Sequence, residues 1–173
     1  PGKYTLKMRA VGYDLVTPRY GAPRTGTAVA IFVTETFSNH LRVKSDPGKH
    51  PKSDEFPVLK LNLVQDFATG IYDYNLQTSA FVALAPVNGR PAGAATKVSL
   101  SSQEWCGNVY SQLLFDSRDL RFASHSYFDG EADLTGSMPC PADAVDEDAL
   151  LVWARGLAWP LLSPGESVTL PHV

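Results

Sequence analysis

Residues 58–64 read VLKLNLV, and large apolar side chains occupy every second position of this stretch. Leu59, Leu61 and Leu63 fall on one face of an extended chain, whereas Lys60 and Asn62 fall on the other. A period of two is the pattern of a β-strand that packs one face on a core and exposes the other face to water. The stretch therefore predicts a β-rich fold.

The next segment, residues 70–84 (GIYDYNLQTSAFVAL), continues the same pattern. Its first face carries mainly apolar side chains, namely Tyr72, Tyr74, Leu76, Ala80 and Val82. Its second face carries polar side chains, namely Asp73, Asn75, Gln77 and Ser79. The two segments together indicate an antiparallel sheet with one wet side.

Further strands are predicted on both sides of this pair. Residues 27–37 are apolar on both faces from Ala28 to Val33, which is typical of a central strand. The short segment 116–119 (DSRD) is a plausible hairpin link between two later strands. With residues 58–64 and 70–84, the chain is expected to form about seven strands, the others being 4–10, 27–37, 96–105, 108–115 and 120–128.

Loops and one helix complete the predicted layout. Residues 17–26 contain two prolines and two glycines, residues 86–95 are rich in Pro, Gly and Ala, and residues 38–57 form a long polar stretch, so all three are expected to be loops. Residues 141–158 carry acidic side chains early, Arg155 late and Gly156 at a stop position, which are helix signals. The predicted fold is mainly β, an antiparallel curved sheet or open barrel with one C-terminal helix.

Composition restricts the class of protein. Hydrophobic residues make up 44% and charged residues 19% of the 173 residues, as in an ordinary globular domain. The formal net charge of −3 and the lack of a basic stripe argue against a nucleic-acid partner. No apolar run approaches the ~18 residues that span a bilayer. Because the chain opens without Met and ends in SVTLPHV, we expect residues 1–173 to be one domain of a fragment or a processed chain.

The tripeptide Trp105-Cys106-Gly107 resembles the start of a thiol redox site. A thioredoxin-type site needs a second cysteine three positions later at the start of a helix, and position 109 is Val. We therefore expect Cys106 to be a buried, unreactive thiol, Trp105 to supply core area, and Gly107 to relieve a bulge or tight turn. Cys140 is the only other cysteine, and a disulfide between the two stays open.

Two weak catalytic pairs remain as alternatives. Cys106 would need a base, and the nearest one, His125, lies one predicted hairpin away. Glu104 and Glu131 are the carboxyl pair that glycoside hydrolysis requires, although nothing in the spacing sets their separation.

Acidic and aromatic residues supply further candidate sites. Asp129, Glu131 and Asp133 are weak candidates for a calcium-like metal site, but FDGEAD reads more simply as a turn. Aromatic side chains either form a ligand surface or belong to the sheet core, and they are Tyr72, Tyr74, Trp105, Tyr110 and Tyr127. No cofactor is indicated.

The segment WARGLAWPLL (153–162) is unusually apolar for a region near a chain end. It is expected to dock on the sheet, or to meet another protein, a membrane surface or a missing second half. The residues predicted to bind a partner or ligand are Trp105, Tyr110, Trp153, Trp159, Leu161 and Leu162.

Several blocks together resemble a known but uncharacterised group of proteins. They are RYG (19–21), AVAIFVTETF (28–37), VLKLN (58–62), TGIYDY (69–74), SSQEWCGNVYSQL (101–113) and SHSYFDGEADL (124–134). They resemble the N-terminal half of exported, lipoprotein-like bacterial proteins, over residues 4–156, with QEWCG and SYFxGEAD as the most specific parts. The resemblance implies an exported location, periplasmic or associated with the cell envelope, a β-rich fold and no catalytic residue. Where members of the family often have His after WCG, this chain has Asn108.

Two functions are therefore predicted as alternatives. The first is a non-catalytic exported binding or accessory subunit of a cell-envelope complex, whose partner is a protein or the missing second half. The second is a hydrolase that uses Cys106 with His125, or Glu104 with Glu131. The hydrolase requires two of these groups to face one solvent-filled cleft.

Overall fold

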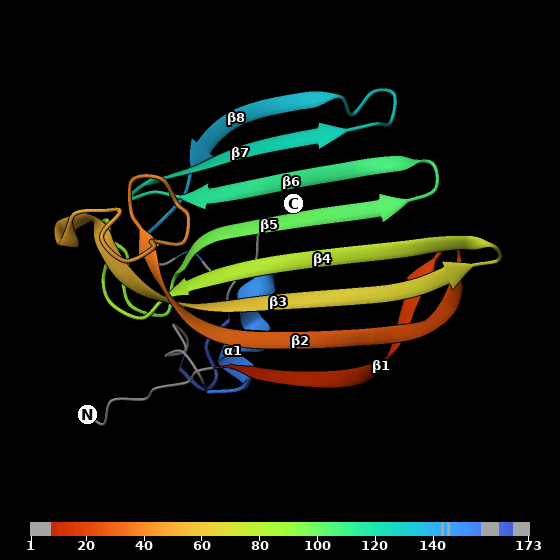
Figure 1. The fold of residues 1–173 in the computed structure, drawn as a ribbon, viewed down its shortest axis with the longest axis horizontal. Helices are drawn as coiled ribbons and strands as arrows, with labels where there is room; N and C mark the ends of the chain where they lie inside the picture. Colours follow the sequence, from red (N-terminus) through yellow and green to blue (C-terminus); the bar gives the residue numbers. More distant parts are fainter. Residues whose placement is uncertain (1–7, 143, 145, 157–162, 168–173) are drawn as a thin grey trace.

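The computed structural model describes residues 8–142, 144, 146–156 and 163–167. Its eight strands form one antiparallel sheet in which each strand pairs with the next along the chain (Figure 1). The sheet is curved and is not closed, so β1 and β8 are its edges. The strands are β1 (Arg9–Arg19), β2 (Ala22–Ser38), β3 (Glu55–Thr69), β4 (Tyr72–Ala83), β5 (Ala95–Glu104), β6 (Gly107–Phe115), β7 (Asp119–Ser126) and β8 (Asp133–Pro139).

One face of the sheet holds the main core, and we call it the helix-side face. Leu59 and Leu61 of β3 point to this face, as the alternation predicts, and both are buried. Strands β2 to β7 extend the cluster, with Phe32, Ala80, Val98, Leu113, Phe115 and Leu120 among its members. Burial of each large apolar side chain contributes roughly 1.5–3 kcal/mol, so this cluster is the main source of stability.

A short helical segment covers part of this face. The 3-10 helix η2 (Glu147–Ala149) and helix α1 (Leu150–Ala154) pack on it through Ala149 and Val152, and α1 is seen behind the sheet in Figure 1. Arg90 is buried and donates to the carbonyl oxygens of Pro141 (3.0 Å) and Ala144 (3.1 Å). The Arg90 guanidinium thus ties the segment before η2 to the connection between β4 and β5.

The opposite face, which we call the outer face, is polar along most of its length. The Ser79 hydroxyl donates to Asn62 Oδ1 at 2.7 Å, and Lys60 pairs with Glu35 at 2.6 Å. Only near the β2–β3 connection does this face carry a second buried cluster, in which Phe37 stacks on Phe81 at 4.9 Å. Elsewhere the outer face is polar except along β2 and the neighbouring part of β3, where Val29, Ile31, Val33 and Val64 lie on it.

The predicted loop 17–26 is wrong, because this segment is the hairpin between β1 and β2. Tyr20 and Gly21 form its turn with φ of 53° and 71°, the positive values that a type I′ turn requires at both central positions. Pro18 lies opposite Pro23. Arg19 and Ala22 form the hydrogen-bonded pair that closes the turn. The next pair, Pro18 and Pro23, is a non-hydrogen-bonded pair, so neither missing N–H is needed between the two strands. Of the predicted strand 4–10, residues 9 and 10 belong to β1, residue 8 precedes it, and residues 4–7 lie outside the described residues.

Other boundaries also differ from the prediction. The helix is much shorter than 141–158, although Gly156 ends it with a φ of 64° as predicted. The long loop 38–57 is shorter too, since β2 continues to Ser38 and β3 begins at Glu55. Strand β8 is an eighth strand that the sequence does not indicate. Its residues, DLTGSMP, are all exposed, and only Leu134 and Met138 among them are large and apolar, which is too weak a signal to predict a strand.

The two cysteines are far apart in the topology and both are free. Cys140 is buried where the chain leaves β8, and Cys106 lies in the turn between β5 and β6. The disulfide that the sequence leaves open is therefore not formed.

Candidate binding site

Four hairpins turn at the same end of the sheet, because consecutive strands of a meander reverse direction at alternating ends. Each of these turns presents a large side chain to solvent: Tyr20 is 68%, Ile71 77%, Trp105 64% and Tyr127 71% exposed. Tyr72, also exposed, lies beside Trp105 with ring centroids 5.5 Å apart. We call these residues the hairpin rim: Tyr20, Ile71, Tyr72, Trp105 and Tyr127.

The β1–β2 tip is fixed by a ring cluster on the helix-side face. Strand β2 pairs with β3 only as far as Gly26, and residues 22–25 pair with β1 alone. The free end of this hairpin curls over the helix-side face, so that the hydroxyls of Tyr20 and Tyr74 lie 2.7 Å apart. Arg19 caps both rings, with its guanidinium carbon 4.9 Å and 5.1 Å from the two centroids.

Tyr74 is the buried base of this cluster. Its ring stacks on Phe67 at 5.0 Å and an interplanar angle of 2°, and its side chain is almost fully buried. Burial, with hydrogen bonds to Tyr20 and Glu104, raises the pKa of Tyr74 to about 12. The phenol is therefore neutral near pH 7 and acts as a packing and hydrogen-bonding group.

Tyr127 is seated on Gly107 at the opposite side of the rim. A Cβ on Gly107 would lie 2.4 Å from the Tyr127 ring, so only glycine leaves room for this contact. Phe128 packs edge-on against Tyr127 at 5.8 Å. Gly107 does follow the two-residue turn, but the need for glycine comes from the exposed Tyr127 ring and not from a bulge or a positive φ.

The charge around the rim is predominantly acidic. Residues 68–75, 103–108 and 126–133, which form three of the tips, contain five acidic residues and no Lys or Arg; these are Asp73, Glu104, Asp129, Glu131 and Asp133. Basic residues occur only beside the β1–β2 tip, where Arg19 is engaged by the tyrosine rings. The rim therefore combines exposed rings with negative charge.

The prediction of a buried Cys106 is wrong. Cys106 is exposed because it lies in the two-residue turn between Glu104 and Gly107 rather than in a strand interior. Its thiol contacts the Tyr72 hydroxyl, and this contact is the main cause of the raised pKa of Tyr72. Trp105 supplies exposed area instead of core area.

In the two candidate catalytic pairs, each residue contacts a partner outside its own pair. His125 lies opposite Tyr110 on the outer face and contacts Asp133 through Nδ1 at 2.9 Å, whereas Cys106 contacts Tyr72 on the side of β4. The cross-strand register places Glu104 beside Tyr74 on the helix-side face, while Glu131 accepts from Ser126 in the β7–β8 turn at 2.9 Å.

The acidic residues of FDGEAD form a turn and do not converge. Asp129 lies in the tip, Glu131 contacts Ser126, and Asp133 contacts His125. Within the described residues, no group of three His, Cys, Asp or Glu side chains is arranged to hold a metal. No described helix is long and apolar enough to cross a membrane.

The residues predicted to bind a partner are divided by the structure. Trp105 belongs to the rim, and Tyr110 is exposed on the outer face. Trp153 packs against the core and donates to the Gly93 carbonyl at 3.1 Å, so its docking is intramolecular. Trp159, Leu161 and Leu162 lie outside the described residues.

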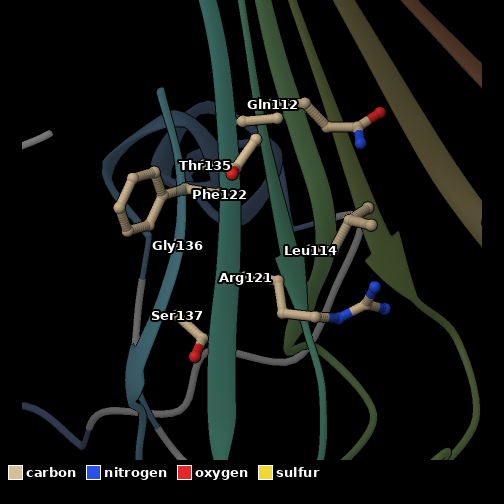
Figure 2. Close-up of a pocket in the computed structure, with 8 residues that line it drawn as sticks. Gln112, Leu114, Arg121, Phe122, Thr135, Gly136 and Ser137 are labelled. Atoms are coloured by element: carbon tan, nitrogen blue, oxygen red, sulfur yellow. The ribbon is translucent and has the colours of Figure 1, made fainter. Parts of the chain in front are cut away.

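A shallow cavity of about 450 Å³ lies over β6, β7 and β8, away from the rim. Figure 2 shows Gln112, Leu114 and Arg121 on one side of the strands and the Phe122 ring on the other. The Arg121 guanidinium is already paired with Asp116 at 2.6 Å. The cavity thus offers mainly apolar contacts, with neutral polar groups beside them.

Comparisons of the chain with protein-family models, with curated proteins and with solved structures found no match. The family resemblance of the QEWCG and SYFxGEAD blocks stays a prediction. The sequence does not single out Tyr20 and Ile71, since each follows or precedes a glycine in a stretch that reads only as a turn. The available signal is a large side chain beside the turn glycine in RYGA and TGIY, a position that a two-residue hairpin exposes.

Proposed function

We propose that this chain is a non-catalytic binding module of an exported cell-envelope complex, and that the hairpin rim recognises a protein partner rich in Lys or Arg. The observation that carries the proposal is the set of large exposed side chains on all four turns at one end of the sheet. Exposed Trp and Tyr side chains in such a cluster are typical centres of protein interfaces. The exported location rests on the family resemblance alone.

The preference for a basic partner follows from charge and ring chemistry. Asp73, Glu104 and Asp129 lie among the rim side chains and attract cations. A Lys or Arg placed over Trp105 or Tyr127 gains about 0.5–2 kcal/mol from the ring face. Burial of each rim side chain adds roughly 1.5–3 kcal/mol before the entropy cost of association.

Rigidity of the rim supports the same function. Tyr20 is held by Tyr74 and Arg19, Trp105 lies against Tyr72, and Tyr127 lies on Gly107. A preorganised surface loses less side-chain entropy when a partner binds. The separate partners of Cys106, His125, Glu104 and Glu131 favour binding over hydrolysis.

Photo-crosslinking in the native cell envelope tests the proposal. A photoreactive phenylalanine derivative is placed at Ile71, Trp105 or Tyr127 in separate variants, with Tyr110 as the matched control because it is an exposed aromatic on the outer face. We expect one discrete protein adduct from the three rim positions and none from position 110. High salt should weaken the adduct, since it screens the attraction between the acidic rim and a basic partner.

Two results would contradict this function. Equal adducts from Tyr110 and the rim positions would show that the rim is not the recognition surface. Adducts with lipid or glycan, or protein adducts that high salt leaves unchanged, would show that the partner has a different chemistry.

A further inference from the structure

Strand β8 is an open edge of the sheet. It pairs with β7 only, and each of its seven residues is exposed. Figure 1 shows no described element beyond it. An edge strand of this kind presents unpaired backbone N–H and C=O groups, which another strand can bind.

The hydrogen-bond register identifies which residues offer these groups. Ser126 N donates to Ala132 O at 3.2 Å, and Cys140 N donates to Arg118 O at 2.6 Å. Hydrogen-bonded pairs recur at every second position of an antiparallel ladder, so the backbone groups of Leu134, Gly136 and Met138 face β7. The backbone groups of the alternate residues therefore point outward, namely those of Asp133, Thr135, Ser137 and Pro139.

The two edges differ in how they discourage pairing. The edge strand β1 carries Arg9, Asp14 and Arg19 as well as Pro18, which are charges and a proline that oppose strand addition. Strand β8 carries a single charge, Asp133 at its first position, and a proline at its last. Its centre, residues 134–138, is neutral.

The side chains of β8 form a partly exposed apolar strip on the helix-side face. Leu134 and Met138 project on the helix-side face and are 53% and 45% exposed. Between them, the Phe122 ring lies over Gly136, where a Cβ would come within 2.5 Å of the ring. Thr135 and Ser137 project on the outer face, beside the cavity of Figure 2.

We infer that β8 pairs antiparallel with β8 of a second copy of this chain, about a two-fold axis through Gly136. In this register Leu134 lies opposite Met138 of the second copy, Thr135 lies opposite Ser137, and Asp133 lies opposite Pro139. Apolar side chains meet apolar ones, hydroxyls meet hydroxyls, and the two aspartates are at opposite ends. The strand is thus complementary to itself, as a two-fold interface requires.

The backbone agrees with the same register. Thr135 and Ser137 point their N–H and C=O groups outward, so each exchanges both hydrogen bonds with its counterpart in the second copy. Asp133 N–H donates to the Pro139 carbonyl, which needs no proline N–H. An axis through Thr135 or Ser137 would instead set Gly136 opposite Leu134 or Met138 and leave these side chains without an apolar partner.

The first test is the mass of the protein in solution, measured by sedimentation over a range of concentrations. An edge pairing of one strand is a small interface, so we expect a dimer with a Kd on the order of 10 µM. Thr135→Pro removes an outward N–H and should weaken the dimer at least about tenfold, whereas Thr135→Ser should leave it unchanged. Trp105→Ser should also leave the dimer unchanged, because the rim is separate.

The second test reports the register even if Thr135→Pro fails to fold. Leu134→Cys and Met138→Cys are made in separate chains that also carry Cys106→Ser, and the chains are oxidised with copper-phenanthroline alone or mixed. We expect a crosslink only in the mixture, since Leu134 meets Met138 of the second copy at disulfide distance. A protein that is monomeric at all concentrations, a folded Thr135→Pro variant that still dimerises, or crosslinks within each unmixed sample would overturn the inference.

Discussion

Gly26 is the position where the β1–β2 hairpin leaves the sheet, and Gly26→Ala is the most informative change for the fold. Gly26 forms the last pair of β2 with β3, opposite Phe67. A Cβ at this position would lie 2.1 Å from the Asp66 carbonyl oxygen and 2.7 Å from Phe67 Cβ. These are contacts with the backbone and the base of a side chain, so neither can move without shifting β3.

The expected cost is worked out from two contributions. Overpacking of a tight contact costs about 1–3 kcal/mol. The shift of β2 that partly relieves this contact also separates the buried Tyr74 hydroxyl from Tyr20, which adds about 1 kcal/mol. We therefore expect Gly26→Ala to lower the free energy of unfolding by about 2–4 kcal/mol, or roughly 5–10 °C in Tm for a chain of this size.

The matched control is Gly12→Ala. Gly12 lies in β1, and a Cβ there meets no atom within 4 Å. Alanine should raise the stability by about 0.5 kcal/mol at this position, because the unfolded chain loses freedom without a new clash. Urea unfolding followed by circular dichroism measures both variants. Equal stabilities of the two variants would refute the close-approach argument at Gly26.

Three further predictions follow from thiol exposure and from the pKa shifts. Native protein should be alkylated rapidly at Cys106 and only after unfolding at Cys140, as mass spectrometry of the modified peptides would show; protection of Cys106 would contradict its place in an open turn. The pKa of Tyr74 is raised to about 12, so the stability that its neutral phenol contributes is complete below pH 10 and is lost between about pH 10 and 12. Tyr74→Phe should flatten this part of a curve of unfolding free energy against pH. An unchanged curve would count against the shift. Burial raises the pKa of Asp146 to about 6, so its ionised form destabilises the fold above that pH. Asp146→Asn should raise the free energy of unfolding at pH 7 by on the order of 1 kcal/mol and have little effect near pH 4. A loss of stability at pH 7 would argue that the charge is needed.

The sequence alone determines the strands whose two faces differ in polarity. Leu59, Leu61 and Leu63 alternate with Lys60 and Asn62 because one side of β3 packs on the core, and this requirement is visible in the residues themselves. The same signal identifies β4 to β7 and the mainly antiparallel β fold. Gly156 marks the helix end correctly, since a positive φ favours glycine.

The tertiary structure decides which segments form strands where the sequence has no clear alternation of apolar and polar residues. Every residue of β8 is exposed, and its alternation rests on Leu134 and Met138 alone, with Gly136 between them. This weak signal does not predict a strand, and β8 forms because β7 supplies a hydrogen-bonded edge. The β1–β2 hairpin contains Pro18 and Pro23, which read as loop until the register shows that neither missing N–H is needed between the strands.

The candidate site shows the same division. Trp105 and Tyr127 can be selected from the sequence as aromatic candidates, but whether such rings face a core or the solvent depends on where each turn falls. Cys106 is exposed because the turn includes it, two residues after the strand ends at Glu104. The rim exists because a meander brings alternate turns to one end of the sheet. This relation joins turns more than 20 positions apart in the sequence and depends on strand order, which local periodicity does not encode.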